Sequence, residues 1–480
     1  MTAVDVLGGL EPAGVWERFS ELTRIARPPK EEAAAREHVT RWANGLGFET
    51  AVDDEGNLVV RVPASTGREA APGVVLQAHL DMVCEREPES AYDPRAGRIL
   101  VVVDGDWVVA PETTLGADHG IGVAAAMAAA EDPEVIHGPL ELLFTVSEEQ
   151  GLDGAKALDP ALVSGRLLLN LDGTSDSSLT IGCAGSTHTF TRLRLPREPV
   201  PDGWTMLQVA VSGARGGHSG GDIAKGRVNA IKALGRLLVG TPLRLARLEG
   251  GVSRNALPRE ARAIVAVREV SALEEDAERK LAAIREQFAG TDDALALSIE
   301  PVASQDAADE GASAKVLDLL AATPSGVVAM SAALPDKVET STSLNVATTE
   351  EGVVTLASMT RSANARALDD VVASIEAAAR LAGADVKLRP SYPPWRPDLD
   401  SELLATARAT FERLFGIEPA LEVVHGGLEC SVIGDKLPAV QMISLGPEVV
   451  GPHAPGERLS IPGTQRFYRL LAALLDDLSR

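Results

Sequence analysis

Residues that can bind metal ions or transfer protons recur along this 480-residue chain, each after an apolar run or at the start of a predicted helix. They are His79, Asp81, Asp118, Glu148, Glu149, Asp172 and His453. The apolar runs GVVLQA and ELLFTVS, for example, lead into the first pair and into the two glutamates. Because open α/β sheets bind ligands at the carboxyl edge of their strands, we expect these side chains to meet at that edge.

Several carboxylates gathered with imidazoles are costly to bury unless a cation neutralises them. Imidazole and carboxylate ligands suit Zn²⁺, and they also accept Mn²⁺ or Co²⁺. Two histidines with three carboxylates are too many ligands for one four-coordinate ion. Two metal ions bridged by one carboxylate use the set better, and a pair of ions is an established hydrolytic device.

Each of these residues also has an ordinary structural interpretation. His79 alone is typical of a buried structural histidine, and Asp118 alone is typical of a helix N-cap. The pair Glu148–Glu149 resembles a solvated strand end, and Asp172 in LDG resembles a turn residue. These interpretations weaken together, because turn chemistry does not explain why all of them follow strands in the same way.

The elements that must position these residues have the sequence pattern of an α/β fold. Near-continuous apolar runs alternate with helical stretches, which indicates a largely parallel sheet covered on both faces. Residues 14–47 are predicted to be helical with a break at Pro28–Pro29, and Asp104–Gly105 lies between alternating apolar runs, which indicates a hairpin. A core strand is expected in AVQMISLGP, after the amphipathic helix LLATARATFERLFG.

The pattern changes after about residue 185. Strands with stricter alternation follow, with predicted helices at 222–239 and 271–288, as in a separate α+β domain. We therefore expect one domain split in sequence, residues 1–185 and 396–480, interrupted by an inserted domain at 186–395. A chain of this length commonly contains more than one domain.

Composition restricts the partners. A formal charge of −24 argues against nucleic acid or an anionic membrane. No secretory signal or long apolar span is visible. The cysteines Cys84, Cys183 and Cys430 lack zinc-ligand or redox spacing and suit a reducing interior, so we expect a cytoplasmic protein.

At this point the motifs carry a resemblance. HLD, GADHG, SEEQG and NLDG, in this order and with a late histidine, resemble the di-zinc metallopeptidase family of aminoacylase-like and carboxypeptidase-like enzymes. LQAHLDMVCE, TTLGADHGIGVAAAMA, SRNALPREA and HGGLEC are similar to its subgroup of bacterial aminoacyl-histidine (Xaa-His, carnosinase-like) dipeptidases. The resemblance spans nearly the whole chain. It implies an α/β catalytic domain with a mixed, mostly parallel sheet, and an inserted α+β lid domain.

The resemblance also implies a role for each ligand. His79, Asp118 and Asp172 are expected to hold one ion, and Asp118, Glu149 and His453 the other, so that Asp118 bridges the two. The implied cofactor is a pair of divalent ions, Zn²⁺ in the first place, with Mn²⁺ or Co²⁺ as alternatives.

Two further carboxylates of this region have implied roles beside the ions. Asp81 is expected to orient His79, in the usual carboxylate–histidine–metal arrangement. Glu148 is expected to be the general base that takes a proton from water and passes it to the leaving amine. His119 departs from the family, which has Asp or Asn at this position, and it receives no role.

The inserted domain supplies further candidates. GARGGHSGGDI resembles a lid motif whose histidine, here His218, stabilises the oxyanion of the scissile carbonyl. Asn255 and Arg361 match positions that contact the substrate carboxylate, for which a guanidinium is suited by bidentate pairing. HGGLEC resembles a substrate-binding loop in which glycines admit close backbone approach. The loop residues concerned are His425, Gly426, Gly427 and Glu429.

The function expected is therefore hydrolysis of unsubstituted dipeptides, such as Xaa-His including β-alanyl-histidine. An aminoacylase or related amide hydrolase uses the same metal chemistry and remains the alternative. A relative that binds metal without turnover is a third hypothesis, which the presence of Glu148 and of every ligand disfavours. The expected partner is a small peptide, with no nucleic acid and no membrane. A homodimer is implied by the family, and His218 acts either on its own chain or on a partner subunit.

Overall fold

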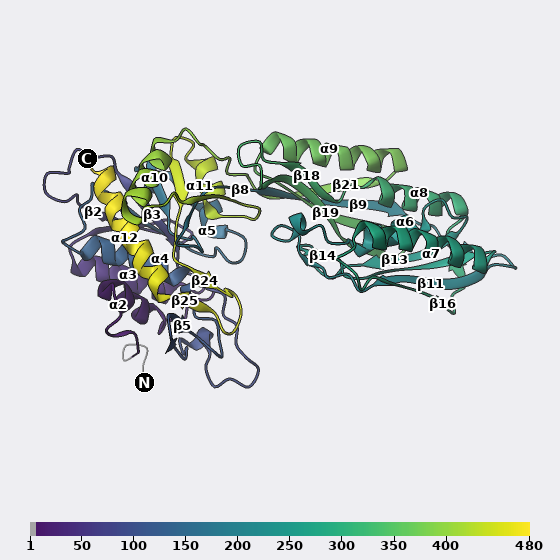
Figure 1. Ribbon diagram of the computed structural model, residues 1–480, viewed down its shortest axis with the longest axis horizontal. Coiled ribbons are helices and arrows are strands. Elements are labelled where there is room, and N and C mark those ends of the chain that lie inside the picture. Colours follow the sequence, from purple (N-terminus) through teal and green to yellow (C-terminus); the bar gives the residue numbers. More distant parts are fainter. Residues whose placement is uncertain (1–5) are drawn as a thin grey trace. The chain divides into compact units, whose positions relative to one another are not determined.

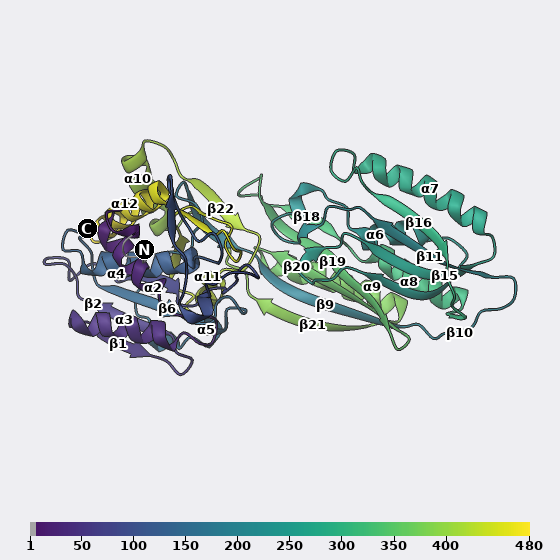
Figure 2. The ribbon, with the colours of Figure 1, turned by 90° about the horizontal axis from the view of Figure 1, so that it is seen from below.

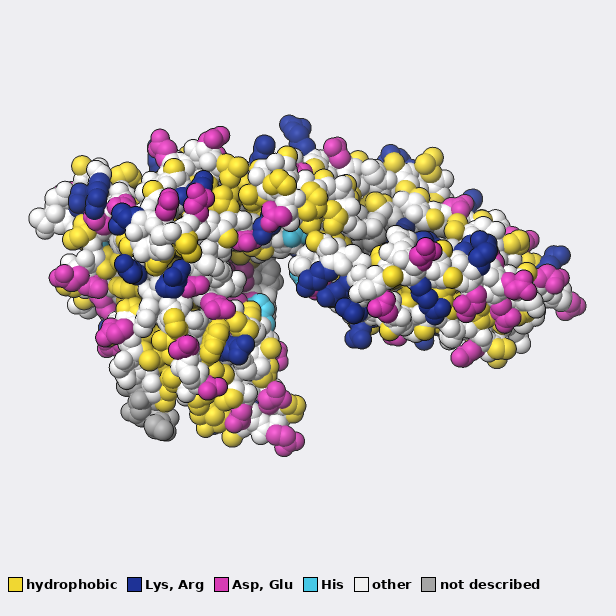
Figure 3. Space-filling model, viewed as in Figure 1, with side chains coloured by type: hydrophobic (Ala, Val, Ile, Leu, Met, Phe, Trp, Pro, Cys, Tyr) yellow, Lys and Arg dark blue, Asp and Glu magenta, His cyan; other side chains and the backbone are white. Residues whose placement is uncertain are grey.

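The computed structural model describes residues 6–480, which divide into two compact units. Of these residues, the first unit combines 6–182, 395–423 and 428–480, and the second combines 183–394 with 424–427. The inserted domain expected at 186–395 covers nearly the same residues as the second unit. Over the face shown in Figure 3, acidic and basic side chains are interspersed on both units.

The first unit is built on an eight-stranded mixed sheet, as the sequence predicts (Figure 1). Its central strands run parallel in the order β6, β3, β7 and β23, and the flanking strands β1, β2 and β8 pair antiparallel. The strands, in sheet order, are β1 (Glu49–Val52), β2 (Leu58–Val62), β6 (Leu140–Thr145), β3 (Val74–His79), β7 (Leu167–Asn170), β23 (Gln441–Ser444), β8 (Ser178–Cys183) and β22 (Ala420–Val424). Every residue of β3 and β6 is buried, which explains why most of their residues are apolar.

Helices cover this sheet. The predicted helix at 14–47 is two helices, α2 (Ala13–Leu22) and α3 (Ala33–Gly45), with an irregular connection around the two prolines. The others are α4 (Ala117–Glu131), α5 (Asp153–Ala157), α10 (Glu402–Phe415), α11 (Glu429–Lys436) and α12 (Ile461–Leu478). Helix α4 packs on β3 and β6, and α2 packs on α4. Small residues all around α4 allow this close burial, since all of its residues are buried except Asp118 and Glu131.

A smaller sheet completes the first unit. It has the order β24 (Val449–Val450), β25 (Arg458–Ser460), β5 (Trp107–Val109) and β4 (Val102–Asp104). The predicted hairpin at Asp104–Gly105 is confirmed, because Asp104 pairs with Trp107 across a two-residue turn. This sheet joins a segment after β3 to the late segment that carries His453, although more than 300 residues separate them in sequence.

The second unit contains a nine-stranded sheet whose recorded pairs are all antiparallel (Figure 2). Its strands are β16 (Ala296–Pro301), β11 (Thr205–Ser212), β15 (Ala261–Val267), β13 (Arg244–Gly250), β19 (Val338–Glu350), β20 (Val353–Ser362), β9 (Gly185–Arg194) and β21 (Asp385–Tyr392), with β18 (Gly326–Met330) beside β19. A short separate pair joins β12 (Gly217–His218) to β14 (Ala256–Leu257), and another joins β10 (Glu198–Pro199) to β17 (Asp306–Ala307).

The helices of the second unit are α6 (Ala230–Leu238), α7 (Val270–Gln287), α8 (Glu310–Ala322) and α9 (Ala365–Ala382). The helix expected at 271–288 is α7, but the one expected at 222–239 was too long. Gly226 has a left-handed φ of 63°, and α6 begins only after Asn229, whose side chain caps it. No helix among residues 6–480 is long and apolar enough to cross a membrane.

Candidate metal centre

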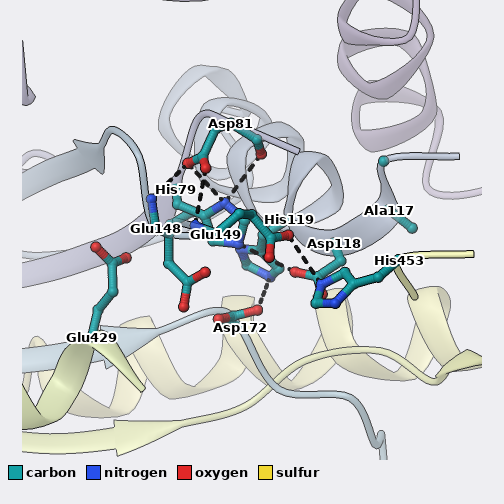
Figure 4. Close-up of polar contacts among 12 residues, drawn as sticks. His79, Asp81, Ala117, Asp118, His119, Glu148, Glu149, Asp172, Glu429 and His453 are labelled. Carbon is teal, nitrogen blue, oxygen red and sulfur yellow. Dashed lines mark hydrogen bonds and ion pairs between the residues drawn. The ribbon is translucent and has the colours of Figure 1, made fainter. Parts of the chain in front are cut away.

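The candidate ligands gather at the carboxyl edge of the parallel strands in the first unit (Figure 4). His79 is the last residue of β3, the two glutamates follow β6, and Asp172 follows β7. Asp118 comes from the first turn of α4, where its φ and ψ of −80° and 107° are not helical. We call His79, Asp118, Glu148, Glu149, Asp172 and His453 the metal cluster.

Asp118 lies between the two histidines of the metal cluster. One carboxylate oxygen is 3.2 Å from Nε2 of His79, and the other is 3.2 Å from Nε2 of His453. His453 also lies 3.1 Å from a carboxylate oxygen of Glu149. One carboxylate therefore faces two imidazoles through its two oxygens, which is the geometry of a bridging ligand.

Three groups of ligand atoms within the metal cluster are compact enough to hold an ion, with all atoms of a group within 4.8 Å of one another. The first two are His79, Asp118, Asp172 and Asp118, Glu149, His453. They share Asp118 and coincide with the two ligand sets that the family resemblance implies. The third group, His79, Glu148 and Glu149, overlaps with both. Imidazole and carboxylate donors in this number fit zinc-type ions.

Asp81 lies behind the metal cluster and does not belong to any of these groups. Its carboxylate is 3.4 Å from Nδ1 of His79 and accepts hydrogen bonds of 3.1 Å from the backbone N–H groups of Glu148 and Glu149. These bonds and His79 lower the pKa of Asp81, although burial opposes them. Asp81 thus contacts both His79 and the loop of the two glutamates.

Glu148 and His453 of the metal cluster have raised pKa values. Burial, reinforced by the carboxylates of Asp172 and Glu429, raises the pKa of Glu148 well above its usual value, although His79 opposes this shift. Hydrogen bonds to Asp118 and Glu149 raise the pKa of His453 to about 10. The two shifts have different main causes, burial for Glu148 and hydrogen bonds to carboxylates for His453, and a bound cation would oppose both.

Two residues of the metal centre have an unusual backbone. Ser147, just before Glu148, has a φ of 53°, and His453 has a φ of 64°. A residue other than glycine rarely adopts this left-handed conformation, and it persists where the surroundings enforce it. The backbone N–H of Ser147 donates to the buried carboxylate of Glu32 at 2.9 Å, which fixes the turn that presents Glu148.

His119 is buried behind the metal cluster. Its ring centroid is 5.7 Å from that of His79, and its Nε2 is 3.9 Å from a carboxylate oxygen of Asp172. Burial and the neighbouring His79 lower its pKa to about 3, so the ring is neutral at pH 7. Gly122 leaves space for the His119 ring, because a Cβ at position 122 would lie 1.8 Å from that ring.

Glu429 lies apart from the loop glycines with which the sequence motif groups it. It begins α11 in the first unit and is 1% exposed, whereas Gly426 and Gly427 belong to the second unit. One of its oxygens accepts hydrogen bonds from Gln77 at 2.6 Å and from Thr145 at 2.8 Å. Glu429 therefore anchors buried polar groups on β3 and β6 instead of lying in an open loop.

The other candidates lie in the second unit, around Gly220. A Cβ at Gly220 would lie 2.3 Å from the carbonyl oxygen of His425, 3.2 Å from the His218 ring and 3.3 Å from Nε of Arg361. We call His218, Arg361 and His425 the cation cluster. Asn255 adjoins it through its backbone carbonyl, which accepts from Ser219 N–H at 2.8 Å, while its side chain is exposed.

Arg361 is a buried cation without a paired carboxylate in the contacts recorded for it. Its side chain is on β20 and 3% exposed, and it donates to the Tyr392 hydroxyl at 3.1 Å and to the Met359 sulfur at 3.3 Å. Its Nε has no hydrogen-bond partner among the described residues. Gly427 lies against the same tyrosine, since a Cβ there would be 2.6 Å from its ring.

The ring of His218 has a defined tautomer. Its Nδ1 accepts from the backbone N–H groups of Gly220 and Gly221 at 3.3 and 3.0 Å, so the ring proton is on Nε2. Burial and the Arg361 cation lower the pKa of His218, which keeps the ring neutral. An exposed neutral imidazole with a free Nε2–H group is a hydrogen-bond donor.

Sequence reasoning missed two buried residues of the first unit, Arg27 and Glu457. Both are 1% exposed, and both make hydrogen bonds to the loops that carry the candidate ligands. Neither follows a strand or lies in a motif with recognisable spacing, so only the location of Glu457 four residues after His453 was available as an indication.

The fold and the metal cluster define a class of protein, and comparison with known families agrees with it. Residues 75–477 match peptidase family M20/M25/M40, and the chain belongs to this family. It is therefore a hydrolase of peptide bonds, as predicted, and its mixed α/β architecture is confirmed.

Individual relatives are similar over their full length. The chain is 37% identical to the cytosol non-specific dipeptidase of Escherichia coli K12, over 98% of this chain and 99% of that protein. The crystal structure of aminoacylhistidine dipeptidase from Vibrio alginolyticus superposes with a TM-score of 0.92 at 36% identity, covering 98% of this chain and 97% of that one. Aminopeptidase PepT from Bacillus cereus, at 17% identity and a TM-score of 0.59, shares the fold.

Proposed function

We propose that the chain is a metallodipeptidase that hydrolyses the peptide bond of unsubstituted dipeptides, including Xaa-His and β-alanyl-histidine. The observation that carries the proposal is the pair of ligand groups that share Asp118, with Glu148 beside them. The two full-length relatives, both dipeptidases by name, support the substrate class.

The proposed cofactor is a pair of divalent ions, Zn²⁺ in the first place and Mn²⁺ or Co²⁺ as alternatives. His79, Asp118 and Asp172 would hold one ion, and Asp118, Glu149 and His453 the other. When bound, the ions would polarise the scissile carbonyl and lower the pKa of a water molecule.

The chain's own residues perform the proton transfers in this proposal. Glu148 accepts a proton from the attacking water and returns it to the leaving amine, because its carboxylate is left free when the neighbouring Glu149 is a ligand. Asp81 holds the His79 ring in orientation and fixes the backbone of both glutamates, so that the base and the ligands keep their spacing.

The second unit supplies substrate-binding groups in this proposal. The Nε2–H group of His218 donates to the oxyanion that develops on the scissile carbonyl. Arg361, a buried cation without a recorded carboxylate partner, receives the carboxylate of the dipeptide, with Asn255, Gly426 and Gly427 lining the same subsite. We further propose that residues 186–395 form a lid and dimerisation domain, with His218 acting on its own or a partner subunit's site.

A cytoplasmic location is proposed from the reducing-interior cysteine pattern and from the cytosolic relative of Escherichia coli. The formal charge of −24 supports a small peptide, rather than nucleic acid or an anionic membrane, as the partner.

One experiment tests the activity. Free dipeptides, including β-alanyl-histidine, and N-acetyl amino acids are assayed with protein reconstituted with Zn²⁺, Mn²⁺ or Co²⁺. Hydrolysis of dipeptides with little activity on N-acetyl substrates is expected. The reverse preference would indicate the aminoacylase alternative, and metal binding without hydrolysis of any substrate would indicate an inactive relative.

A second experiment tests the general base. Glu148→Ala is expected to lower kcat by about 10²–10⁴-fold, as is usual when a general base is removed, while both ions remain bound. Metal content measured by elemental analysis is the control. Full activity in this variant would contradict the proposed mechanism.

A further inference from the structure

We propose that Arg27 and Glu457 form a two-sided clamp that fixes the segment 115–118 and thereby positions the bridging carboxylate of Asp118. Neither side chain belongs to a ligand group, and each acts through the backbone. They are positioning residues for the proposed two-metal site, and the inference rests on that proposed function.

Glu457 holds the segment from its N–H side. One carboxylate oxygen accepts from the backbone N–H groups of Leu115 and Gly116 at 2.6 and 3.0 Å. The other oxygen accepts from Ala117 and Asp118 at 2.8 and 3.2 Å. These N–H groups precede and begin α4, where a helix lacks internal acceptors for them. A single buried carboxylate therefore supplies the acceptors for four consecutive residues.

Arg27 holds the same segment from its carbonyl side. Its Nη2 donates to the carbonyl oxygen of Gly116 at 2.6 Å, and its Nη1 donates to those of Leu80 and Asp81 at 2.9 and 3.0 Å. The guanidinium thus connects the segment before Asp118 to the residues that directly follow His79.

Glycines make room for this cation. A Cβ at Gly116 would lie 2.5 Å from Nη2 of Arg27, and a Cβ at Gly120 would lie 2.6 Å from the same atom. Gly116 also has a φ of 71°, a conformation that favours glycine. The helix start is therefore shaped to admit the guanidinium.

The two side chains act on one peptide segment with opposite charges. Gly116 donates its N–H to Glu457 and gives its carbonyl to Arg27, so its two peptide planes are fixed from both sides. Asp118 leaves this fixed segment with its oxygens 3.2 Å from each histidine, so a displacement of the segment would alter both ligand groups.

The test is the affinity of metal-free protein for Zn²⁺, measured by calorimetry. Glu457→Gln keeps the side chain's shape but replaces one acceptor oxygen by an NH₂ group, which faces two N–H donors. Outer groups that orient ligands typically contribute about 10–100-fold in metal affinity, and a loss of this size is expected. Glu448→Gln is the matched control, because Glu448 is an exposed acid in the same late segment, and it should bind as the wild type does.

A structural role alone would give a different result. It would lower the melting temperature of metal-free and metal-loaded protein equally and leave the affinity of the folded protein unchanged. Circular dichroism establishes folding, and KM for a dipeptide at saturating Zn²⁺ is expected to change little. A folded Glu457→Gln protein that binds both ions with wild-type affinity would overturn the proposal.

Arg27→Met gives an independent arm, with Arg24→Met, an exposed arginine nearby, as its control. Because both residues hold one segment, the double variant should lose less affinity than the product of the two single losses. Independent, multiplying losses would overturn the clamp as a unit. If Glu457→Gln does not fold, Arg27→Lys, which keeps the cation but not the forked geometry, decides by the same titration. Wild-type protein that binds fewer than two ions would instead overturn the proposed function.

Discussion

The metal cluster and the cation cluster have charged groups of opposite sign. The metal cluster collects carboxylates around two imidazoles, and the pKa values of Glu148 and His453 are raised there. The cation cluster collects an arginine and two histidines, and burial and that arginine lower the pKa of His425 to about 4. The first has an excess of acidic groups, and the second has a buried guanidinium without a paired carboxylate in its recorded contacts.

This difference in charge supports the ligand proposed for each cluster. Divalent ions would replace the protons of the metal cluster, and a substrate carboxylate would neutralise Arg361. Both clusters combine buried and exposed groups. His79 and Arg361 are 1% and 3% exposed, whereas His453 and His218 are exposed.

Removing metal tests the first half of this comparison and should have the largest effect. Chelation is expected to abolish hydrolysis, and Zn²⁺ should restore it. Because His453 retains its proton up to a pKa of about 10, ion binding must release that proton. The apparent Kd for Zn²⁺ should therefore fall as pH rises, by about tenfold per pH unit for each proton released. Calorimetry in buffers of different ionisation enthalpy counts the protons, and a Kd independent of pH would contradict this.

His218→Ala tests the donor of the second unit. A loss of about 10²–10³-fold in kcat is expected, which is the usual effect of removing one oxyanion donor, with metal content unchanged. Mixing this variant with Glu148→Ala protein then distinguishes the source of the histidine. Recovered activity in mixed dimers would mean that His218 serves a partner subunit.

Arg361→Met tests the cation cluster and is expected to have a smaller effect than His218→Ala. Charge-assisted hydrogen bonds contribute about 1.5–3 kcal/mol each, so KM for dipeptides should rise by roughly 10–100-fold with a smaller change in kcat. Dipeptide amides, which lack the carboxylate, should be affected much less. Arg380→Met, an exposed arginine of α9, is the control, and equal losses for dipeptides and their amides would argue against carboxylate binding.

Gly122→Ala tests how tightly the metal cluster is packed, and it has the smallest expected effect. The new methyl group would overlap the His119 ring, and overpacking of this kind costs about 1–3 kcal/mol of stability. The free energy of unfolding from urea titration measures it. His119→Ala should remove most of the cost in the double variant, and a cost that persists there would place its origin elsewhere.

The sequence predicted the residues of the metal cluster because their position depends on a simple rule. The carboxyl ends of parallel strands lie at one edge of the sheet. Side chains that follow β3, β6 and β7 therefore lie close together, whatever the conformation of the loops. Asp118 and His453 do not directly follow parallel strands of this sheet. Asp118 was predicted from its place at the start of a helix, and His453 from its place after an apolar run.

The supporting residues follow no such rule. Arg27 and Glu457 bind backbone groups that are far away in sequence. Because nearly every residue has the same backbone groups, a sequence pattern cannot indicate which of them a side chain binds. Glu429 was grouped with the glycines beside it, but the boundary between the units passes between Gly427 and Leu428. The helix expected from residue 222 was shorter because Gly226 and the Asn229 cap delay its start.

The order in which the centre's parts occur along the chain has a consequence for its biosynthesis. His79, Asp118, Glu149 and Asp172 leave the ribosome early, whereas His453 and Glu457 follow only after the whole second unit. Domains generally fold as units during synthesis. The first unit includes β23, β24, β25 and α12, so its fold is incomplete until these late elements have been made. A nascent chain therefore lacks both the second histidine and the carboxylate that fixes the Asp118 segment. Hydrolytic competence would therefore arise only after His453 and Glu457 have been synthesised.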